Sequence, residues 1–119
     1  MIDYADRFVS STYADDEPVC LTVHTQDRAD RHSVSIPESL FARAQAIASA
    51  YKLHLLPTLE IYAETSLDKD QCATLLDEVR FIGEVTNDQL LGGHLIEIAK
   101  ALERCVTSSG AAAVLIEGP

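Results

Sequence analysis

Residues 68–85, with the sequence DKDQCATLLDEVRFIGEV, contain the clearest amphipathic helix pattern in the chain. Asp68, followed three residues later by Gln71, is typical of a capping box, which begins a helix by satisfying two backbone N–H groups. Apolar side chains then recur at spacings of three and four residues, so they share one face of the helix. The pattern predicts a helix whose buried stripe contains Cys72, Leu75, Leu76, Val79 and Ile82.

A helix is also predicted before this stretch. Ser35 and Glu38 have the spacing of a capping box, and Pro37 suits the first turn of a helix. Apolar residues follow at spacings of four, three and four, which indicates one inward face. That face is expected to contain Leu40, Ala44, Ile47 and Tyr51.

A third helix is predicted after the central one. Thr86 and Gln89 have the spacing of a capping box at its start. Gly92 and Gly93 weaken a helix by roughly 1 kcal/mol each relative to alanine, so regular helix is expected only from about His94. The inward stripe is expected to contain Leu91, Leu95, Ile98, Leu102 and Cys105.

Strands are predicted where apolar and polar residues alternate, because this period is typical of a strand with one buried face. Residues 19–24 alternate in this way, and residues 33–36 resume the alternation after a charged turn at 26–31, which predicts a hairpin. Residues 59–64 alternate as well. Residues 112–116 are apolar throughout, which favours a central strand or one covered on both faces.

One-sided strands and amphipathic helices together predict a two-layer α+β sandwich. We expect a mixed or antiparallel sheet of about four or five strands, with about three helices packed mainly on one face. The 119 residues suit a single domain, residues 1–119. Residues 7–13 suit either a strand or a helical turn, and strand propensity favours the strand. The order of the strands does not follow from the sequence.

Charge limits the classes of partner. Nineteen acidic residues against nine lysines and arginines give a net charge of −10, and residues 60–88 alone contain eight acids and two bases. Such a charge disfavours direct binding to nucleic acid or to anionic lipid, and it speeds encounter with basic proteins. No apolar run is long enough to cross a bilayer, and the acidic N-terminus does not resemble a secretory signal. We therefore expect a cytoplasmic protein that does not bind membranes.

The cysteines do not suggest a disulfide framework or a zinc finger. There are three, an odd number, and no two have the Cys-x-x-Cys spacing. Cys72 and Cys105 lie on predicted inward stripes, where a free cysteine usually acts as a small apolar side chain. No motif for a nucleotide, a metal or another cofactor occurs, so we expect neither a cofactor nor a metal site.

One set of residues would suit an enzyme. If the strands at 19–24 and 59–64 were neighbours, Cys20 and His24 would share a face with Glu60 and Glu64, and a thiol, an imidazole and a carboxylate are the parts of a nucleophilic site. His24 and His32 with either glutamate would be the corresponding metal ligands. Alternation places such residues on one face without bringing them together, so an ordinary polar surface is the preferred interpretation.

The central helix also contains a candidate binding surface. Asp70, Thr74, Asp77 and Phe81 follow one another at helical spacing opposite the buried stripe, and Glu78 lies beside them. Acidic side chains around an exposed aromatic residue are typical of an interface, in which the charges steer the partner and the aromatic ring anchors it. The alternative is a solvated acidic face with Phe81 packed under a neighbouring loop.

The chain resembles the small acidic immunity proteins that bacteria pair with polymorphic toxins. The resemblance is carried by the size of the chain, by the acids around Asp70, Asp77 and Glu78, and by the helix-to-strand ending, and it covers roughly residues 66–119. It implies a non-catalytic, cytoplasmic protein that binds and inhibits a cognate toxin, often a basic nuclease. The alternatives are an acidic secretion chaperone or adaptor, which typically forms homodimers, and a small enzyme using Cys20, His24 and Glu60.

Overall fold

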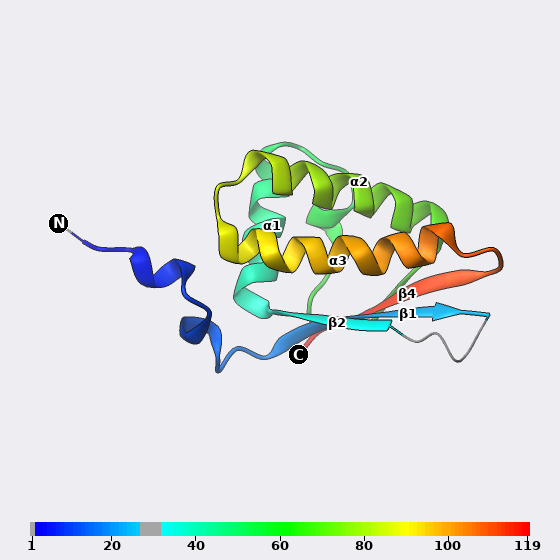
Figure 1. The fold of residues 1–119 in the computed structure, drawn as a ribbon, viewed down its shortest axis with the longest axis horizontal. Coiled ribbons are helices and arrows are strands. Elements are labelled where there is room, and N and C mark those ends of the chain that lie inside the picture. Colours follow the sequence, from blue (N-terminus) through cyan, green and yellow to red (C-terminus); the bar gives the residue numbers. More distant parts are fainter. Residues whose placement is uncertain (1, 27–31) are drawn as a thin grey trace.

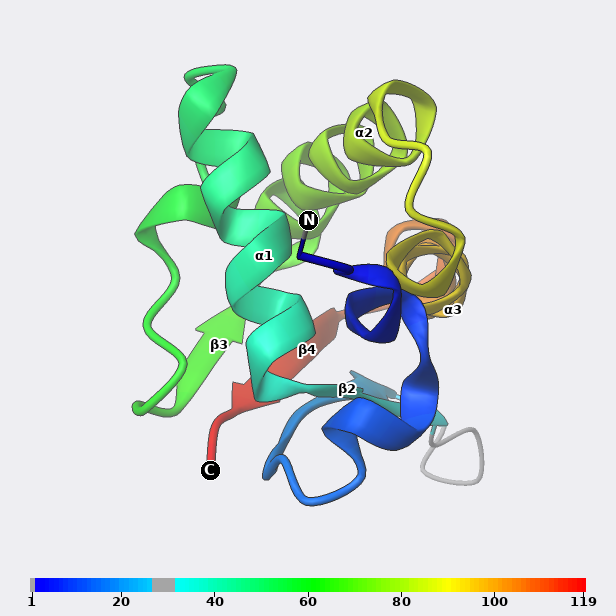
Figure 2. The same cartoon turned by 90° about the vertical axis from the view of Figure 1, so that its left-hand side faces the viewer.

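A computed structural model describes residues 2–26 and 32–119 of the chain. These residues form a two-layer α+β fold in which one antiparallel sheet is covered on one face by α-helices (Figures 1 and 2). This confirms the predicted fold class. In chain order the elements are η1 (Ala5–Phe8), η2 (Ser10–Tyr13), β1 (Pro18–Thr25), β2 (His32–Pro37), α1 (Glu38–Ala50), η3 (Leu56–Thr58), β3 (Thr65–Leu67), α2 (Lys69–Val85), α3 (Gln89–Thr107) and β4 (Ala112–Glu117).

The sheet has the strand order β2-β1-β4-β3 and every pairing is antiparallel. Two predictions are confirmed: β1 and β2 form a hairpin, and the apolar strand β4 is central. Residues 27–31 of the predicted turn lie outside the described residues. Leu21 of β1 lies opposite Val34 of β2 and Ile116 of β4, so apolar side chains meet in rows on the helix-covered face. The opposite face, which we call the open sheet face, contains Cys20, Thr22, His24, Ser33, Ser35, Ser66, Ala113, Leu115 and Glu117.

Helix α2 begins as its sequence predicts. The side chain of Asp68 accepts a hydrogen bond from the Gln71 N–H at 2.8 Å, and the Gln71 side chain accepts one from the Asp68 N–H at 3.0 Å. All five residues of the predicted apolar stripe are buried. The local pattern was sufficient here because both the cap and the stripe lie within one continuous segment.

Helix α3 begins earlier than predicted. Its N-cap is Asp88, whose carboxylate accepts a hydrogen bond from the Leu91 N–H at 3.0 Å, so Gly92 and Gly93 lie inside the helix. The predicted capping role of Thr86 is wrong, because Thr86 ends α2 and its hydroxyl accepts the Asp88 N–H. The predicted inward stripe of α3 is buried. Among the described residues, no helix is long and apolar enough to span a membrane.

The predicted cap of α1 is also wrong. Ser35 lies in β2, where it is paired with Cys20. The start of α1 is capped from the segment before β1: the Asp16 carboxylate accepts the Ser39 N–H at 3.0 Å, and the Glu17 carbonyl accepts the N–H of the first helical residue. The hydrogen bonds from Ser39 hold the pKa of Asp16 below its usual value. A cap that comes from a distant segment leaves no signal in the sequence around the helix.

Residues 59–64 do not form the predicted strand, and β3 starts only at Thr65. The Gln45 side chain of α1 donates hydrogen bonds to the carbonyls of Leu56 at 3.1 Å and Leu59 at 2.6 Å. These carbonyls therefore face a helix instead of a neighbouring strand. The apolar residue at the start of this alternating segment is buried although the segment is not a strand, because Leu59 packs into the core from a loop.

Residues 7–13 do not form the predicted strand: they belong to the 3₁₀ turns η1 and η2, with Val9 between the two turns. The Tyr13 hydroxyl donates to the Arg7 carbonyl at 2.6 Å, and the Thr12 hydroxyl donates to the Asp6 carbonyl at 2.7 Å. These short-range bonds coil the segment, and both sides of β1 are already paired with other strands. The turn η1 contacts α3, and only the residues before it, 2–4, extend away from the body of the molecule (Figure 1).

Candidate functional site

Three of the five predicted binding residues lie on the solvent side of α2. Asp70, Thr74 and Asp77 are all exposed, and the Thr74 hydroxyl donates to the Asp70 carbonyl of its own helix at 3.3 Å. Within residues 2–26 and 32–119, neither aspartate takes part in an ion pair. Both carboxylates are therefore exposed, and no ion pair with another described residue neutralises them.

Phe81 contacts an aromatic residue of another element. Its ring is half-buried and meets the Tyr51 ring edge to face, with centroids 5.1 Å apart and an interplanar angle of 82°. Tyr51 itself is 53% exposed, so the prediction that it points inward is wrong. It follows the last residue of α1 as the C-cap, where helical spacing no longer determines direction.

Glu78 does not belong to the exposed face, and its prediction as a binding residue is wrong. Its side chain is only 6% exposed. Its carboxylate accepts hydrogen bonds from the N–H of Leu55, at 2.8 and 3.1 Å, and from the N–H of Leu56, at 3.1 Å. Glu78 thereby provides the hydrogen-bond acceptor for the backbone N–H groups at the start of η3. The spacing contained the signal, because position 78 is within one helical turn of the buried Leu75 and Ile82.

The surface that remains consists of three exposed polar residues of α2 and an aromatic pair, formed by Phe81 of α2 and Tyr51 at the end of α1. Asp77 and Phe81 are four residues apart on one helix face, so the aromatic pair continues the row of acids. We call this surface the acidic face. It contains Asp70, Thr74, Asp77, Phe81 and Tyr51.

The residues of the enzyme hypothesis do not come together. Cys20 and His24 share the open sheet face but are four residues apart along a strand, about 13 Å. Glu60 and Glu64 precede β3, and β4 separates β3 from β1. A nucleophile, a base and a carboxylate in contact are the minimum for this chemistry, so the arrangement does not support it.

The predicted histidine ligands are separated as well. His32 lies opposite Val23 and therefore shares the core side of the sheet, whereas His24 lies on the open sheet face. In the part of the chain that the structure describes, no group of three or more His, Cys, Asp or Glu side chains could hold a metal ion.

Two cysteines are part of the core, as predicted. Cys72 and Cys105 are fully buried on α2 and α3. Burial, together with the neighbouring Cys105 thiol, raises the pKa of Cys72 to about 12. The thiolate is the reactive form of cysteine, so this thiol is unreactive at neutral pH.

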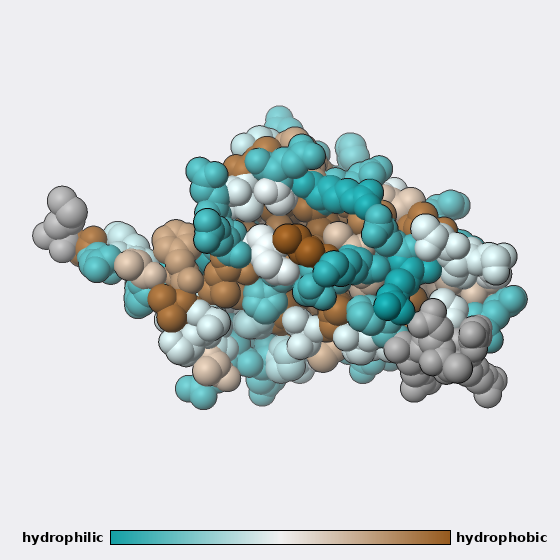
Figure 3. Space-filling view, viewed as in Figure 1, coloured by the Kyte–Doolittle hydropathy of each residue, from teal (hydrophilic) through white to brown (hydrophobic). Residues whose placement is uncertain are grey.

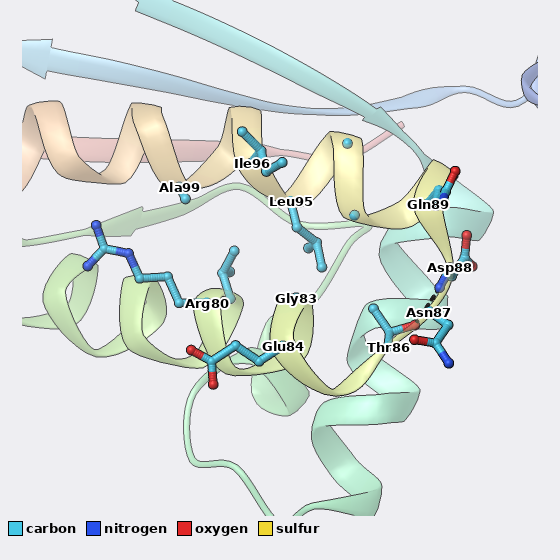
Figure 4. Close-up of a pocket in the computed structure, with 13 residues that line it drawn as sticks. Arg80, Gly83, Glu84, Thr86, Asn87, Asp88, Gln89, Leu95, Ile96 and Ala99 are labelled. Atoms are coloured by element: carbon cyan, nitrogen blue, oxygen red, sulfur yellow. Dashed lines mark hydrogen bonds between the residues drawn. The ribbon is translucent and has the colours of Figure 1, made fainter.

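A groove runs between α2 and α3 and encloses about 610 Å³ (Figure 4). Its apolar surface includes Val79, Leu95 and Ile96, and Ile96 is 59% exposed. Polar side chains such as Arg80 and Glu84 line its edge. We call this feature the α2–α3 groove. Sequence reasoning missed it, because a groove depends on how two helices pack.

Three glycines line the α2–α3 groove from inside helices. A Cβ atom added at Gly83, Gly92 or Gly93 would meet no atom within 4 Å outside its own helical turn. Packing inside the chain therefore does not explain them, although each weakens its helix.

Replacing Gly83 with alanine should raise the free energy of unfolding by about 0.5–1 kcal/mol, because alanine favours the helix and its methyl group enters open space. Urea denaturation of the variant and of the unmodified chain measures the difference. A destabilised variant would contradict the open environment of this glycine.

Comparison of the chain with protein-family models, with curated proteins and with solved structures found no match, so its own geometry carries the functional interpretation.

Proposed function

We propose that this chain is a non-catalytic binding module that recognises a basic protein through its acidic face, and that it serves as an immunity protein against a toxin. The observation that carries the proposal is the pair of exposed carboxylates, Asp70 and Asp77, neither of which forms an ion pair among the described residues. A basic partner would supply the missing charge.

Charge would set the rate at which the partner associates, and the aromatic pair would set the rate at which it dissociates. A chain with a net charge of −10 attracts a basic surface over several ångströms, and the acids of α2 give this attraction a direction. Tyr51 supplies an exposed ring, and the edge-to-face contact with the half-buried Phe81 ring restricts its orientation. Rings supported in this way are the usual anchors of protein interfaces.

An acidic secretion chaperone or adaptor is the second candidate, and the α2–α3 groove is the observation that favours it. A chaperone would hold an extended segment of a secreted protein against apolar surface, whereas an immunity protein would bind a folded toxin. Binding to the folded partner, with loss of the partner's activity, distinguishes the two.

The test uses the product of the neighbouring open reading frame as the partner. Co-expression should protect cells from that product, and the purified proteins should associate with a rate that falls as salt is added. In the double variant Asp70→Asn/Asp77→Asn, we expect association at low salt to slow about tenfold and its salt dependence to flatten, with little change in dissociation.

The matched control is Glu97→Gln/Glu103→Gln, which changes the net charge by the same amount. Glu97 is paired with Lys100 at 3.2 Å and Glu103 is paired with Arg80, so neither carboxylate contributes an uncompensated charge. The control should keep most of the association rate. If both double variants slow association equally, net charge alone steers the partner and the acidic face is not the binding site.

A further inference from the structure

The N-terminal arm, residues 2–12, is rich in apolar side chains that the described chain does not cover. Ile2, Tyr4, Phe8 and Val9 are between 48% and 70% exposed. The arm extends from the body, and its apolar residues are visible as brown atoms outside the compact part (Figure 3). Uncovered apolar side chains gathered on one segment are typical of an interaction site.

The base of the arm is held in a fixed position. The carbonyl of Arg7 accepts hydrogen bonds from the Tyr13 hydroxyl at 2.6 Å and from the Arg43 guanidinium at 3.3 Å. Tyr13 is buried and Arg43 belongs to α1, so these bonds tie the arm to the core. They hold η1 against the body, and residues 2–4 extend away from the chain's own helices (Figure 1).

A complementary apolar surface lies on the same molecule. The α2–α3 groove exposes Ile96, and the open space above Gly92 and Gly93 would let another chain approach the helix closely. The arm leaves the body where η1 contacts α3, and the first turns of α3 also line the groove. The arm of the same molecule does not lie in the α2–α3 groove, but the arm of a second molecule could enter this groove.

We infer that two copies of this chain form a two-fold dimer in which the arm of each copy lies in the α2–α3 groove of the other. Such an interface is self-complementary, because each copy provides one arm and one groove. The exchange covers the exposed aromatic residues of both arms. It also accounts for helix glycines that packing within one chain leaves unexplained.

The arms supply a large part of the surface that a stable interface needs. Four side chains, each about half exposed, contribute roughly 400 Å² from each arm, given the areas that large apolar side chains bury. Two arms together contribute roughly 800 Å² of their own side-chain surface, before the surface that they cover on the partner copy is added, and a specific interface buries roughly 1,200–2,000 Å² in total.

Charge distinguishes this dimer from binding to a basic partner. Both copies carry a net charge of −10. The arm has two acids, Asp3 and Asp6, against Arg7, and the groove lining has two acids, Glu84 and Asp88, against Arg80, so both surfaces are net acidic. Repulsion between the copies is screened by salt, so the dimer should strengthen as salt is added. Binding of a basic partner should weaken under the same conditions, and the two proposals can therefore fail independently.

The test is sedimentation equilibrium of the full chain over a range of concentrations and at two salt concentrations. Phe8→Asp and Ile96→Asp should each weaken the dimer about tenfold or more, because each places a charge in the apolar contact. Both residues are exposed within one chain, so circular dichroism should show an unchanged fold. Tyr62→Ser, at an exposed aromatic residue outside the arm and the groove, is the control and should leave the dimer intact.

Mixing the two variants tests the exchange itself. Each variant alone loses both arm–groove contacts, whereas a heterodimer of Phe8→Asp with Ile96→Asp keeps one contact between an intact arm and an intact groove. The mixture should therefore associate more tightly than either variant alone. A chain that stays monomeric at every concentration and salt, or a dimer that neither substitution weakens, would overturn the inference.

Discussion

Replacing Glu78 with alanine should lower the free energy of unfolding by about 3–5 kcal/mol, because two backbone donors would lose a charged acceptor inside the protein. The Glu78 carboxylate accepts the N–H groups of Leu55 and Leu56 at 2.8–3.1 Å, and the side chain is almost fully buried. Water cannot replace it without opening the contact between α2 and the loop before η3. Urea denaturation followed by circular dichroism measures the loss.

Two further variants make this result specific. Glu78→Gln keeps one oxygen acceptor, so it should cost less than alanine. Glu84→Ala removes an exposed glutamate of the same helix and should change stability by about 0.5 kcal/mol or less. A loss below about 1 kcal/mol for Glu78→Ala would mean that the carboxylate does not bind the loop in solution.

The same contact connects stability with the proposed binding surface. Glu78 holds Leu55 and Leu56, and this loop follows directly after Tyr51. Phe81 lies one helical turn beyond Glu78 and supports the Tyr51 ring. Although Glu78 is not exposed to a partner, it positions the segment that carries the exposed ring, so Glu78→Gln should also speed dissociation of the partner.

Replacing Arg43 with methionine should cost about 2–4 kcal/mol, because it leaves the Asp88 carboxylate without its cation in a mostly buried place. The Arg43 guanidinium lies 2.6 Å from Asp88, and the two side chains are 26% and 9% exposed. Arg43 also donates to the Arg7 carbonyl and stacks on the ring of Tyr13 at 5.4 Å. One side chain thus links α1, the N-terminal turns and the start of α3.

A double-mutant cycle separates the ion pair from the other contacts of Arg43. Asp88→Asn keeps an oxygen that can cap α3, so it removes mainly the charge. We expect a coupling energy of about 1–3 kcal/mol between Arg43→Met and Asp88→Asn. The Arg43 variant should also be cleaved faster by proteases between residues 2 and 13. Additive effects of the two substitutions would contradict the ion pair.

The candidate site was predictable only where it depends on one helix. Asp70, Thr74 and Asp77 are exposed as their spacing predicts, since a helix places such residues opposite its buried stripe. Glu78 and Tyr51 were misplaced. Spacing places Glu78 beside the buried Leu75 and Ile82. The loop N–H groups that bind its carboxylate, and the position of Tyr51 as the C-cap of α1, do not follow from helical periodicity.

By itself, the sequence determined the elements whose hydrogen bonds and buried faces are local: the capping box and stripe of α2, the hairpin of β1 and β2, and the inward face of α3. These features repeat at the period of the backbone, and burying one apolar face then requires a second layer. The same reasoning identified a two-layer α+β fold without the order of its strands.

The tertiary structure alone decided the features that depend on partners distant in the chain. Asp16 caps α1, Gln45 binds the carbonyls that would otherwise belong to a strand at 59–64, and Tyr13 with Arg43 coils the N-terminal turns. In each case a side chain from another element forms a hydrogen bond, and the local sequence predicts a different hydrogen-bonding pattern for the segment. Hydrogen-bonding groups must be satisfied wherever they are buried, and only the assembled fold determines which distant group does so.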